Sequence, residues 1–197
     1  MTLSALLRQP IDMKAVAAHL DALSHGQRVA AIEEIDASQQ KALWAASKGF
    51  AKITIENIVP SNLPPMREVI HWGRNTLPIF KLFQKRFCRP DDPAAARAGE
   101  LWGYNEQTFG LFTGPGYFVA YDLPGGEVLV DYTRLPPRGA DGWPEVIPNS
   151  ARLSRFIYNG TKDTLRGVSR HVTIGRAARD GKDMPNWFVL CREDPRG

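Results

Sequence analysis

Apolar and aromatic residues form three runs between Leu101 and Thr133, and two Pro-Gly pairs separate these runs. Pro115 and Pro124 preset φ at the second position of a turn, and the glycine that follows each of them accepts a positive φ. Runs of this length around two turns predict a three-stranded antiparallel meander. We take this meander as the centre of the fold.

The loop length of each hairpin sets the faces of the meander. Two-residue loops would pair Gly114 with Tyr117 and Leu123 with Gly126. One face would then hold Phe112, Tyr117, Val119, Tyr121, Val128, Val130 and Tyr132. The other would hold Phe109, Leu111, Phe118, Ala120, Asp122, Glu127, Leu129 and Asp131. Both faces are largely apolar, so a cover is expected on each side. Pro-Gly disfavours the mirror-image turns of two-residue loops, and a longer loop would shift the register and exchange the faces.

Helical spacing dominates the part of the chain before the meander. Three short helices are expected at Asp12–Leu23, Val29–Ile35 and 36–46, with Asp12 and Asp36 as N-caps. The clearest amphipathic period runs from Thr76 to Phe87. Its apolar side holds Ile79, Phe80, Leu82, Phe83 and Phe87, and its polar side holds Lys81, Gln84, Lys85 and Arg86. We predict a helix there that covers one face of the meander.

Further strands are expected after the meander, at Leu153–Tyr158, Leu165–Gly175 and Asn186–Arg192. With the meander they make about six antiparallel strands, enough for a strongly curved sheet or a partial barrel. The predicted fold class is therefore α+β, with N-terminal helices packed on a curved antiparallel β-sheet or partial barrel. Residues 1–90 form the helical part and residues 100–193 the β part, together in one compact domain.

Composition limits the class of protein. The 197 residues are 43% hydrophobic, which suits a chain that buries one core. The first residues contain only a short apolar run that Arg8 and Pro10 interrupt, so neither a signal peptide nor a membrane span is expected, and we predict a cytoplasmic protein. Cys88 and Cys191 lack the spacing of a zinc site or a disulfide scaffold, and we expect two reduced thiols. The basic neighbours of Cys88 would favour its thiolate.

Motifs for known chemistry are absent from the sequence. It contains no HExxH, Walker, GxSxG or complete GxGxxG motif, and Gly114 and Gly116 supply only the first half of the last. The four histidines do not cluster in sequence. The sequence therefore predicts no metal, no cofactor and no assigned catalytic residue.

Arginine alternates with apolar residues over Leu165–Arg176. If this face pointed into a barrel, Arg166 or Arg170 would be partly desolvated and would need an anion. That anion would be an internal carboxylate such as Asp131 or the carboxylate or phosphate of a ligand. A structural salt bridge, or an arginine solvated at a strand end, is the alternative interpretation.

Aromatic density supports a pocket but also has a structural explanation. Tyr117, Tyr121 and Tyr132 would line its wall with Trp102, Tyr104 and Tyr158, although core packing accounts for the same rings. The irregular segment Leu135–Ser150 would cover the mouth or form an Ω-loop, with Trp143 as its anchor.

Three classes of function remain open. The favoured hypothesis is binding of a small, partly apolar anionic molecule, with Arg166 and Arg170 holding the anion. The second is an enzyme in which His71 or His171 pairs with Asp131 as acid and base. The third is a nucleic-acid or protein interaction domain, because residues 150–197 carry a net charge of +5 against −1 for residues 1–149. Nucleic acid is the less favoured partner, no membrane contact is expected, and the sequence does not predict the oligomeric state.

Overall fold

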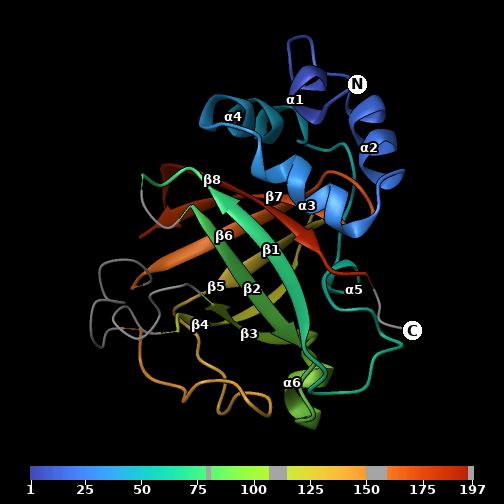
Figure 1. Cartoon of the computed structure of the whole chain (residues 1–197). Coiled ribbons are helices and arrows are strands. Elements are labelled where there is room, and N and C mark those ends of the chain that lie inside the picture. Colours follow the sequence, from blue (N-terminus) through green and yellow to red (C-terminus); the bar gives the residue numbers. More distant parts are fainter. Residues whose placement is uncertain (79–80, 107–114, 150–158, 195–197) are drawn as a thin grey trace.

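The computed structural model describes residues 1–78, 81–106, 115–149 and 159–194. Eight antiparallel strands in these residues form one closed barrel, in which each strand pairs with its sequence neighbours and β8 pairs with β1 (Figure 1). The strands are β1 Val69–Asn75, β2 Leu82–Cys88, β3 Glu100–Glu106, β4 Tyr117–Leu123, β5 Glu127–Asp131, β6 Thr161–Gly167, β7 Val172–Arg179 and β8 Lys182–Arg192. The mixed α+β class is confirmed, and the sheet is a fully closed barrel rather than a partial one.

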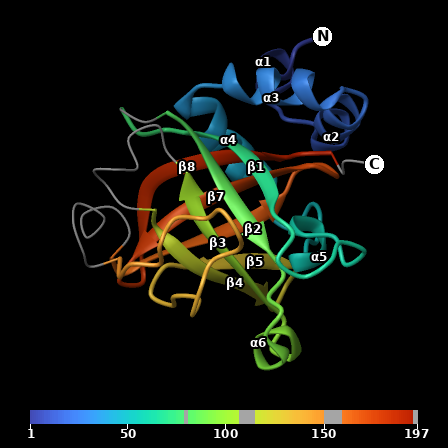
Figure 2. The same cartoon turned by 60° about the horizontal axis from the view of Figure 1, so that its bottom comes forward.

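Six helices accompany the barrel in the described residues. They are α1 Leu3–Leu6, α2 Met13–Asp21, α3 His25–Glu33, α4 Ala37–Ala46, α5 Ile55–Ile58 and α6 Pro93–Arg97. The first four gather on one side, over β7, β8 and β1 (Figure 2). Asp12 and Asp36 cap α2 and α4 as expected, because their carboxylates accept backbone N–H groups of the first turn. An apolar layer that includes Val16, Ile32 and Val189 joins these helices to the outer face of the barrel.

The interior of the barrel is closed at one end by α5. The apolar residues Ile55, Ile58 and Val59 pack into the same core cluster as the inward side chains of the strands. We call this the α5 end, where β1 begins and β8 ends. At the opposite end, β1, β3, β5 and β7 end, and we call it the cavity end.

Phenylalanine rings fill the middle of the barrel, and each lies over a glycine of the neighbouring strand with which it pairs. A Cβ on Gly103 would lie 2.4 Å from the ring of Phe118, and one on Gly175 would lie 2.2 Å from the ring of Phe188. Real Cβ atoms do not approach other atoms so closely, so these positions need glycine for the rings to fit.

The helix predicted over Thr76–Phe87 is wrong. Its second half is β2, which pairs with β1 on one side and with β3 on the other. Phe83 and Phe87 are four residues apart, a spacing that fits one face of a strand as well as one face of a helix. Pairing on both edges decides in favour of the strand.

The predicted meander is confirmed as β3, β4 and β5, but its register differs. Leu123 pairs with Glu127 rather than Gly126, because the loop has three residues and both Gly125 and Gly126 adopt positive φ. This shift by one residue turns Phe118 and Ala120 inward beside Val128, Val130 and Tyr132. Tyr117, Val119 and Tyr121, which were expected on the same face as Val128, Val130 and Tyr132, face outward. The predicted Gly114 pairing and residues 107–114 lie outside the described residues.

The strand predicted over Leu165–Gly175 is two strands. β6 ends at Gly167 and β7 begins at Val172, and the backbone N–H of Val168 donates to Val172 O at 3.0 Å across the turn between them. The strand predicted at Asn186–Arg192 is confirmed as the second half of β8, and Leu153–Tyr158 lies outside the described residues.

Candidate functional site

A cavity of about 200 Å³ lies inside the barrel at the cavity end. An engineered apolar cavity of about 150 Å³ in another protein binds benzene, so this volume suits a molecule about the size of a substituted single ring. The apolar part of its wall is Leu77, Phe83, Ala177, Met184, Trp187 and Phe188. The polar part is Asn75, Lys85, Asn105, Tyr132, Thr161, Asp163, Arg179 and Asn186. Apolar walls with a few convergent polar groups are typical of ligand sites.

A polar cluster forms the inner part of this cavity. Lys85 is only 1% exposed, and its Nζ donates to Asp163 Oδ2 at 3.0 Å, to Asn105 Oδ1 at 3.1 Å and to the hydroxyl of Tyr132. The Tyr132 hydroxyl in turn donates to Asp163 Oδ2 at 3.2 Å and accepts from Asn105 Nδ2 at 2.7 Å. Three residues from β3, β6 and the end of β5 thus meet at the amine of Lys85 in β2.

Aromatic rings surround the same amine. The Nζ of Lys85 lies 4.9 to 5.2 Å from the ring centroids of Tyr132, Phe188 and Phe118, and 5.8 Å from that of Phe83. Rings at this distance stabilise a cation but solvate it less well than water does. Burial therefore lowers the pKa of Lys85, and the nearby Asp163 carboxylate opposes this change in part.

The cavity wall carries more positive than negative charge. Its described ionisable groups are Lys85, Arg179 and Asp163, which leaves one positive charge in excess when all three are ionised. Arg179 pairs across the sheet with Thr161, and its Nε lies 3.4 Å from Thr161 Oγ1. Thr161 precedes Asp163 by two residues on the same face of β6, so Arg179 belongs to a layer about 7 Å closer to the cavity end than the Lys85 cluster.

Trp187 borders the cavity, but its ring is directed to the outer face of β8. It lies between the inward Asn186 and Phe188, and its ring centroid is 5.5 Å from the guanidinium of the outward Arg176 and 6.0 Å from Lys41 Nζ of α4. The indole therefore packs between the barrel and α4 and offers no donor to the cavity.

The α5 end of the barrel is sealed by hydrogen bonds to α5. His71 Nε2 lies 3.0 Å from Ile58 O, which can only accept, so this nitrogen carries the proton. Arg192 donates to Asn57 O at 2.8 Å beside it. The pKa of His71 is lowered to about 3, chiefly by burial and to a smaller extent by the positive charges of Arg192 and Lys85. His71 is thus a neutral structural donor to α5.

The structure places Arg166 on the outer face of β6. Its guanidinium lies 3.6 Å from the ring centroid of Trp44 in α4, and its Nε donates to Glu127 Oε1 at 2.6 Å. Inward positions on β6 are Thr161, Asp163 and Leu165, so Arg166 has the opposite parity. The Arg166–Glu127 contact is thus a structural ion pair, the alternative interpretation that the sequence allowed. The expected packing of Trp44 against the sheet is confirmed.

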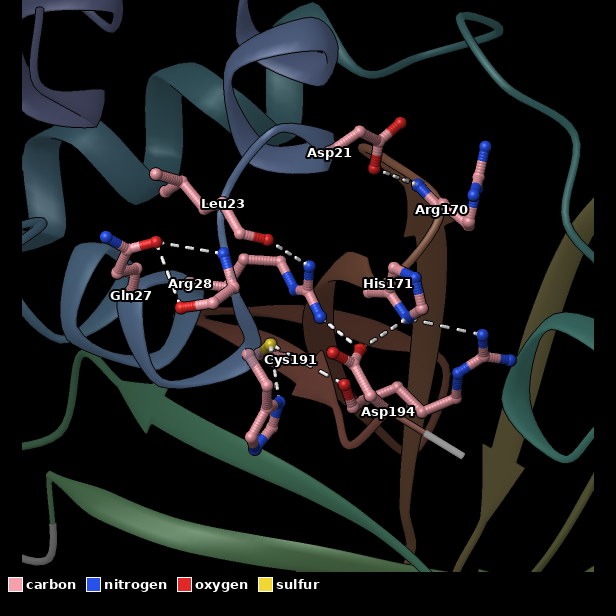
Figure 3. Close-up of polar contacts among 11 residues, drawn as sticks. Asp21, Leu23, Gln27, Arg28, Arg170, His171, Cys191 and Asp194 are labelled. Carbon is pink, nitrogen blue, oxygen red and sulfur yellow. Dashed lines mark hydrogen bonds and ion pairs between the residues drawn. The ribbon is translucent and has the colours of Figure 1, made fainter. Parts of the chain in front are cut away.

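Arg170 and His171 lie in the turn between β6 and β7, at the α5 end (Figure 3). The backbone N–H of Arg170 donates to Asp21 Oδ1 at 3.0 Å, while His171 Nδ1 lies 3.4 Å from Asp194 Oδ1. Asp194 also pairs with the buried Arg28. Burial lowers the pKa of His171, and the positive charge of Arg28 contributes to this. The group ties the end of β8 to α3.

Tyr117, Tyr121 and Asp131 face outward. Tyr117 packs against Tyr104 and donates to Pro144 O, and Tyr121 donates to Asp131 Oδ2 at 3.4 Å. Asp131 also accepts from Lys162 at 2.8 Å and from Thr133. Neither His71 nor His171 belongs to this group, so the structure does not form the acid–base pair with Asp131. Of the seven expected ligand-binding residues, Tyr132 lines the cavity.

Sequence reasoning missed Lys85, Asn105, Asp163 and Arg179 as site residues. Lys85 lies between two inward phenylalanines of β2, and this alternation could have indicated an inward lysine. The helical interpretation of the same segment assigned Lys85 to a solvated face instead.

Residues 135–149 pack on the outer face of the barrel and do not line the cavity. Trp143 is their anchor as expected, because its ring lies 4.9 Å from that of Tyr104 and its Nε1 donates to Glu68 Oε2 at 2.6 Å. Cys88 lies beneath them on the outer face, where burial raises its pKa to about 12, so it is a thiol and not the thiolate considered above.

A larger hollow on the outer surface is lined in part by charges that already have partners. Arg86 pairs there with Glu68 at 3.2 Å, and Arg138 pairs with Asp91. Exposed pairs of this kind contribute little to binding. The barrel cavity is therefore the better candidate site.

No protein-family model, curated protein or solved structure shows significant similarity to the chain. In residues 1–78, 81–106, 115–149 and 159–194, no helix is long and apolar enough to cross a membrane. The same residues hold no group of three or more His, Cys, Asp or Glu side chains arranged to bind a metal ion. The cavity is therefore the feature from which a function can be inferred.

Proposed function

We propose that the barrel binds a small, partly apolar anionic molecule in its cavity. The observation that carries the proposal is a cavity of about 200 Å³ that combines an apolar wall with a buried lysine and an arginine. The α5 end is sealed, so a ligand would be held between the phenylalanine rings and the cavity end.

The charges of the wall support an anion rather than a cation. Asp163 neutralises Lys85, and the guanidinium of Arg179 adds a second positive group to the wall, of the kind that binds a carboxylate or phosphate. Lys85 retains the ability to bind an anion, because a ligand carboxylate would share its protons with Asp163. Asn105 and Tyr132 would fix the orientation of polar groups on the ligand.

The energetic cost of the Lys85–Asp163 pair also supports a binding role. Apolar residues of similar volume in place of a buried ion pair are often neutral or stabilising by about 1 to 4 kcal/mol. A barrel that needed only a core would thus be at least as stable with apolar residues here. A buried ion pair is expected instead where a charge inside the barrel binds a ligand.

The test compares two alanines on opposite faces of β7. Ala177 lines the cavity opposite Asp163, whereas Ala178 pairs with the outward Lys162. Ala177→Phe would fill the cavity, and Ala178→Phe adds the same ring outside it. Benzoate is the probe, and its binding is measured by isothermal titration calorimetry and by NMR chemical shifts of residues that line the cavity.

Benzoate is expected to bind the native protein and the Ala178→Phe variant with similar affinity. The Ala177→Phe variant should bind it at least about tenfold more weakly, a loss of about 1.4 kcal/mol. Native mass spectrometry of the purified protein would show whether a molecule from the cell already occupies the cavity. Equal binding by both variants would place the ligand outside the barrel and contradict the proposal, as would a lack of binding by small aromatic and aliphatic carboxylates.

The nucleic-acid alternative has less support. Two arginines of the basic C-terminal region, Arg166 and Arg176, pair with Glu127 and Asp183, and Arg179 lines the cavity. Charges with internal partners are less available to phosphates.

A further inference from the structure

We propose that Lys85 acts as a nucleophile in the cavity and forms an imine with an aldehyde that also carries a carboxylate. The inference rests on the proposed function and names the class of ligand. Its basis is the geometry of one amine, its proton acceptor and the arginine layer closer to the cavity end.

The position of Lys85 suits this chemistry. The chain has eight lysines, and Lys85 lies inside the barrel within hydrogen-bond reach of a carboxylate and a phenol. Asp163 can accept a proton from the ammonium at 3.0 Å, and the Tyr132 hydroxyl can bind the oxygen of the aldehyde.

A larger fraction of Lys85 is also present as the free amine than of a lysine at the surface. Burial lowers the pKa of Lys85. The fraction of free amine at a pH below both pKa values rises about tenfold for each unit by which the pKa is lowered. Lys162 is the matched contrast, because its hydrogen bond to Asp131 raises its pKa and keeps it protonated.

The reaction is balanced without an oxidant or a cofactor. The Lys85 ammonium gives a proton to Asp163, and its lone pair attacks the aldehyde carbon, so that a C–N bond forms and the carbonyl π bond opens. The Tyr132 hydroxyl gives its proton to the oxygen, and the attacking nitrogen gives a proton back to Tyr132. The result is a neutral carbinolamine. Asp163 then protonates the hydroxyl, water leaves, and the nitrogen lone pair closes the C=N bond. The product is a cationic imine beside the Asp163 carboxylate, and one water is released.

The arginine sets the second feature of the ligand. Arg179 belongs to a layer about 7 Å from Lys85 toward the cavity end, measured as two residues along β6. An aldehyde joined to a carboxylate through one ring or a short chain would place its two ends at these two layers. The apolar wall, including Phe83 and Phe188, would contact the part between them.

The experiment traps the imine by reduction. The native protein is incubated at pH 7 with 4-carboxybenzaldehyde and sodium cyanoborohydride, which converts an imine into a stable secondary amine. Intact mass gives the number of adducts, and peptide mapping locates them. Lys85 is expected to carry the first adduct, at a rate at least about tenfold above any other lysine for each unit by which its pKa is lowered. Benzaldehyde, which lacks the carboxylate, should react more slowly at Lys85.

Two variants serve as controls. Lys85→Met combined with Asp163→Asn removes both charges together, so that no unpaired charge is left in the core, and it should lose the fast adduct. Lys162→Met removes the outward lysine next to Asp163 in β6 and should leave the Lys85 adduct unchanged.

The outcomes separate this inference from the proposed function. Benzoate binding in the cavity with adducts only on surface lysines would overturn the inference and leave the binding function intact. Absence of both benzoate binding and a Lys85 adduct would overturn both. A Lys85 adduct equally fast with benzaldehyde would retain the nucleophile but contradict the assigned carboxylate.

Discussion

Two lysine–aspartate pairs lie on opposite faces of the same part of the barrel. Lys85 and Asp163 meet at 3.0 Å inside it, and Lys162 and Asp131 meet at 2.8 Å outside it. Each pair has one member in β6, and these two members, Lys162 and Asp163, are consecutive in sequence. The side chain of Lys162 is 44% exposed, whereas that of Lys85 is 2% exposed.

The surroundings of an ion pair, rather than the distance between its charges, decide its chemistry here. Both amines have a carboxylate at a similar distance, yet burial lowers the pKa of Lys85, while the hydrogen bond to Asp131 raises that of Lys162. Water solvates the outer ammonium and aromatic rings surround the inner one. The inner pair is thus suited to binding or reaction, and the outer pair to a modest stabilising role.

The largest effect is expected from Lys85→Met. The substitution leaves the Asp163 carboxylate buried without its counter-charge, and removal of one partner of a buried pair costs about 3 to 5 kcal/mol of unfolding free energy. Urea denaturation at pH 7 measures this loss. Lys85→Met together with Asp163→Asn should recover most of it. A single variant as stable as the native protein would show that the interior of the barrel is more hydrated than the pair suggests.

His71 extends the comparison to a buried group without a carboxylate partner. Its pKa is about 3 in the folded protein and about 6.5 in the unfolded chain, so below pH 6.5 the unfolded chain binds a proton that the folded protein does not. This group should therefore lower the unfolding free energy by about 2 kcal/mol between pH 8 and pH 5, and by more as the pH falls toward 3.

The measurement is the difference between the native protein and a His71→Gln variant in urea at several pH values, because carboxylates common to both cancel. Glutamine retains a donor for Ile58 O. The difference should shrink as the pH falls from 6.5, and a difference that does not vary with pH would refute the neutral buried state of His71.

The smallest effect is expected from Lys162→Met. A partly exposed pair contributes about 0 to 1 kcal/mol, and Thr133 and Tyr121 still donate to Asp131 after the substitution. Added salt should reduce this contribution further, because ions screen exposed charges. Urea denaturation at low and high ionic strength checks both statements. A loss as large as that of Lys85→Met would remove the distinction between the two pairs.

Local sequence patterns correctly predicted the elements that local interactions stabilise. Asp12 and Asp36 were recognisable as N-caps because capping involves residues two or three positions apart. The meander was recognisable because Pro124 and Gly125 mark a turn that neighbours in sequence form. Its register was less certain, since Gly126 also adopts a positive φ and adds a third residue to the loop.

The candidate site depended on contacts that no local pattern contains. Asn105, Tyr132 and Asp163 are 20 to 78 residues away from Lys85 along the chain. The predicted pocket residues were chosen by parity, and one misplaced turn gave the wrong parity for Tyr117 and Tyr121. Of the three tyrosines 117, 121 and 132, Tyr132 was on the correct face.

The α+β class, the N-terminal helices, the central meander and the absence of familiar catalytic motifs could be read from the sequence, because periodicity, caps and turns depend on neighbouring residues. The tertiary structure alone decided that β2 is a strand, that the sheet closes and that Lys85 is buried. Closure pairs β1 with β8, whose residues are more than 100 positions apart, and this pairing determines which face of every strand is inside. A lysine between two phenylalanines suits a solvated helix or a barrel interior equally well until that pairing is known.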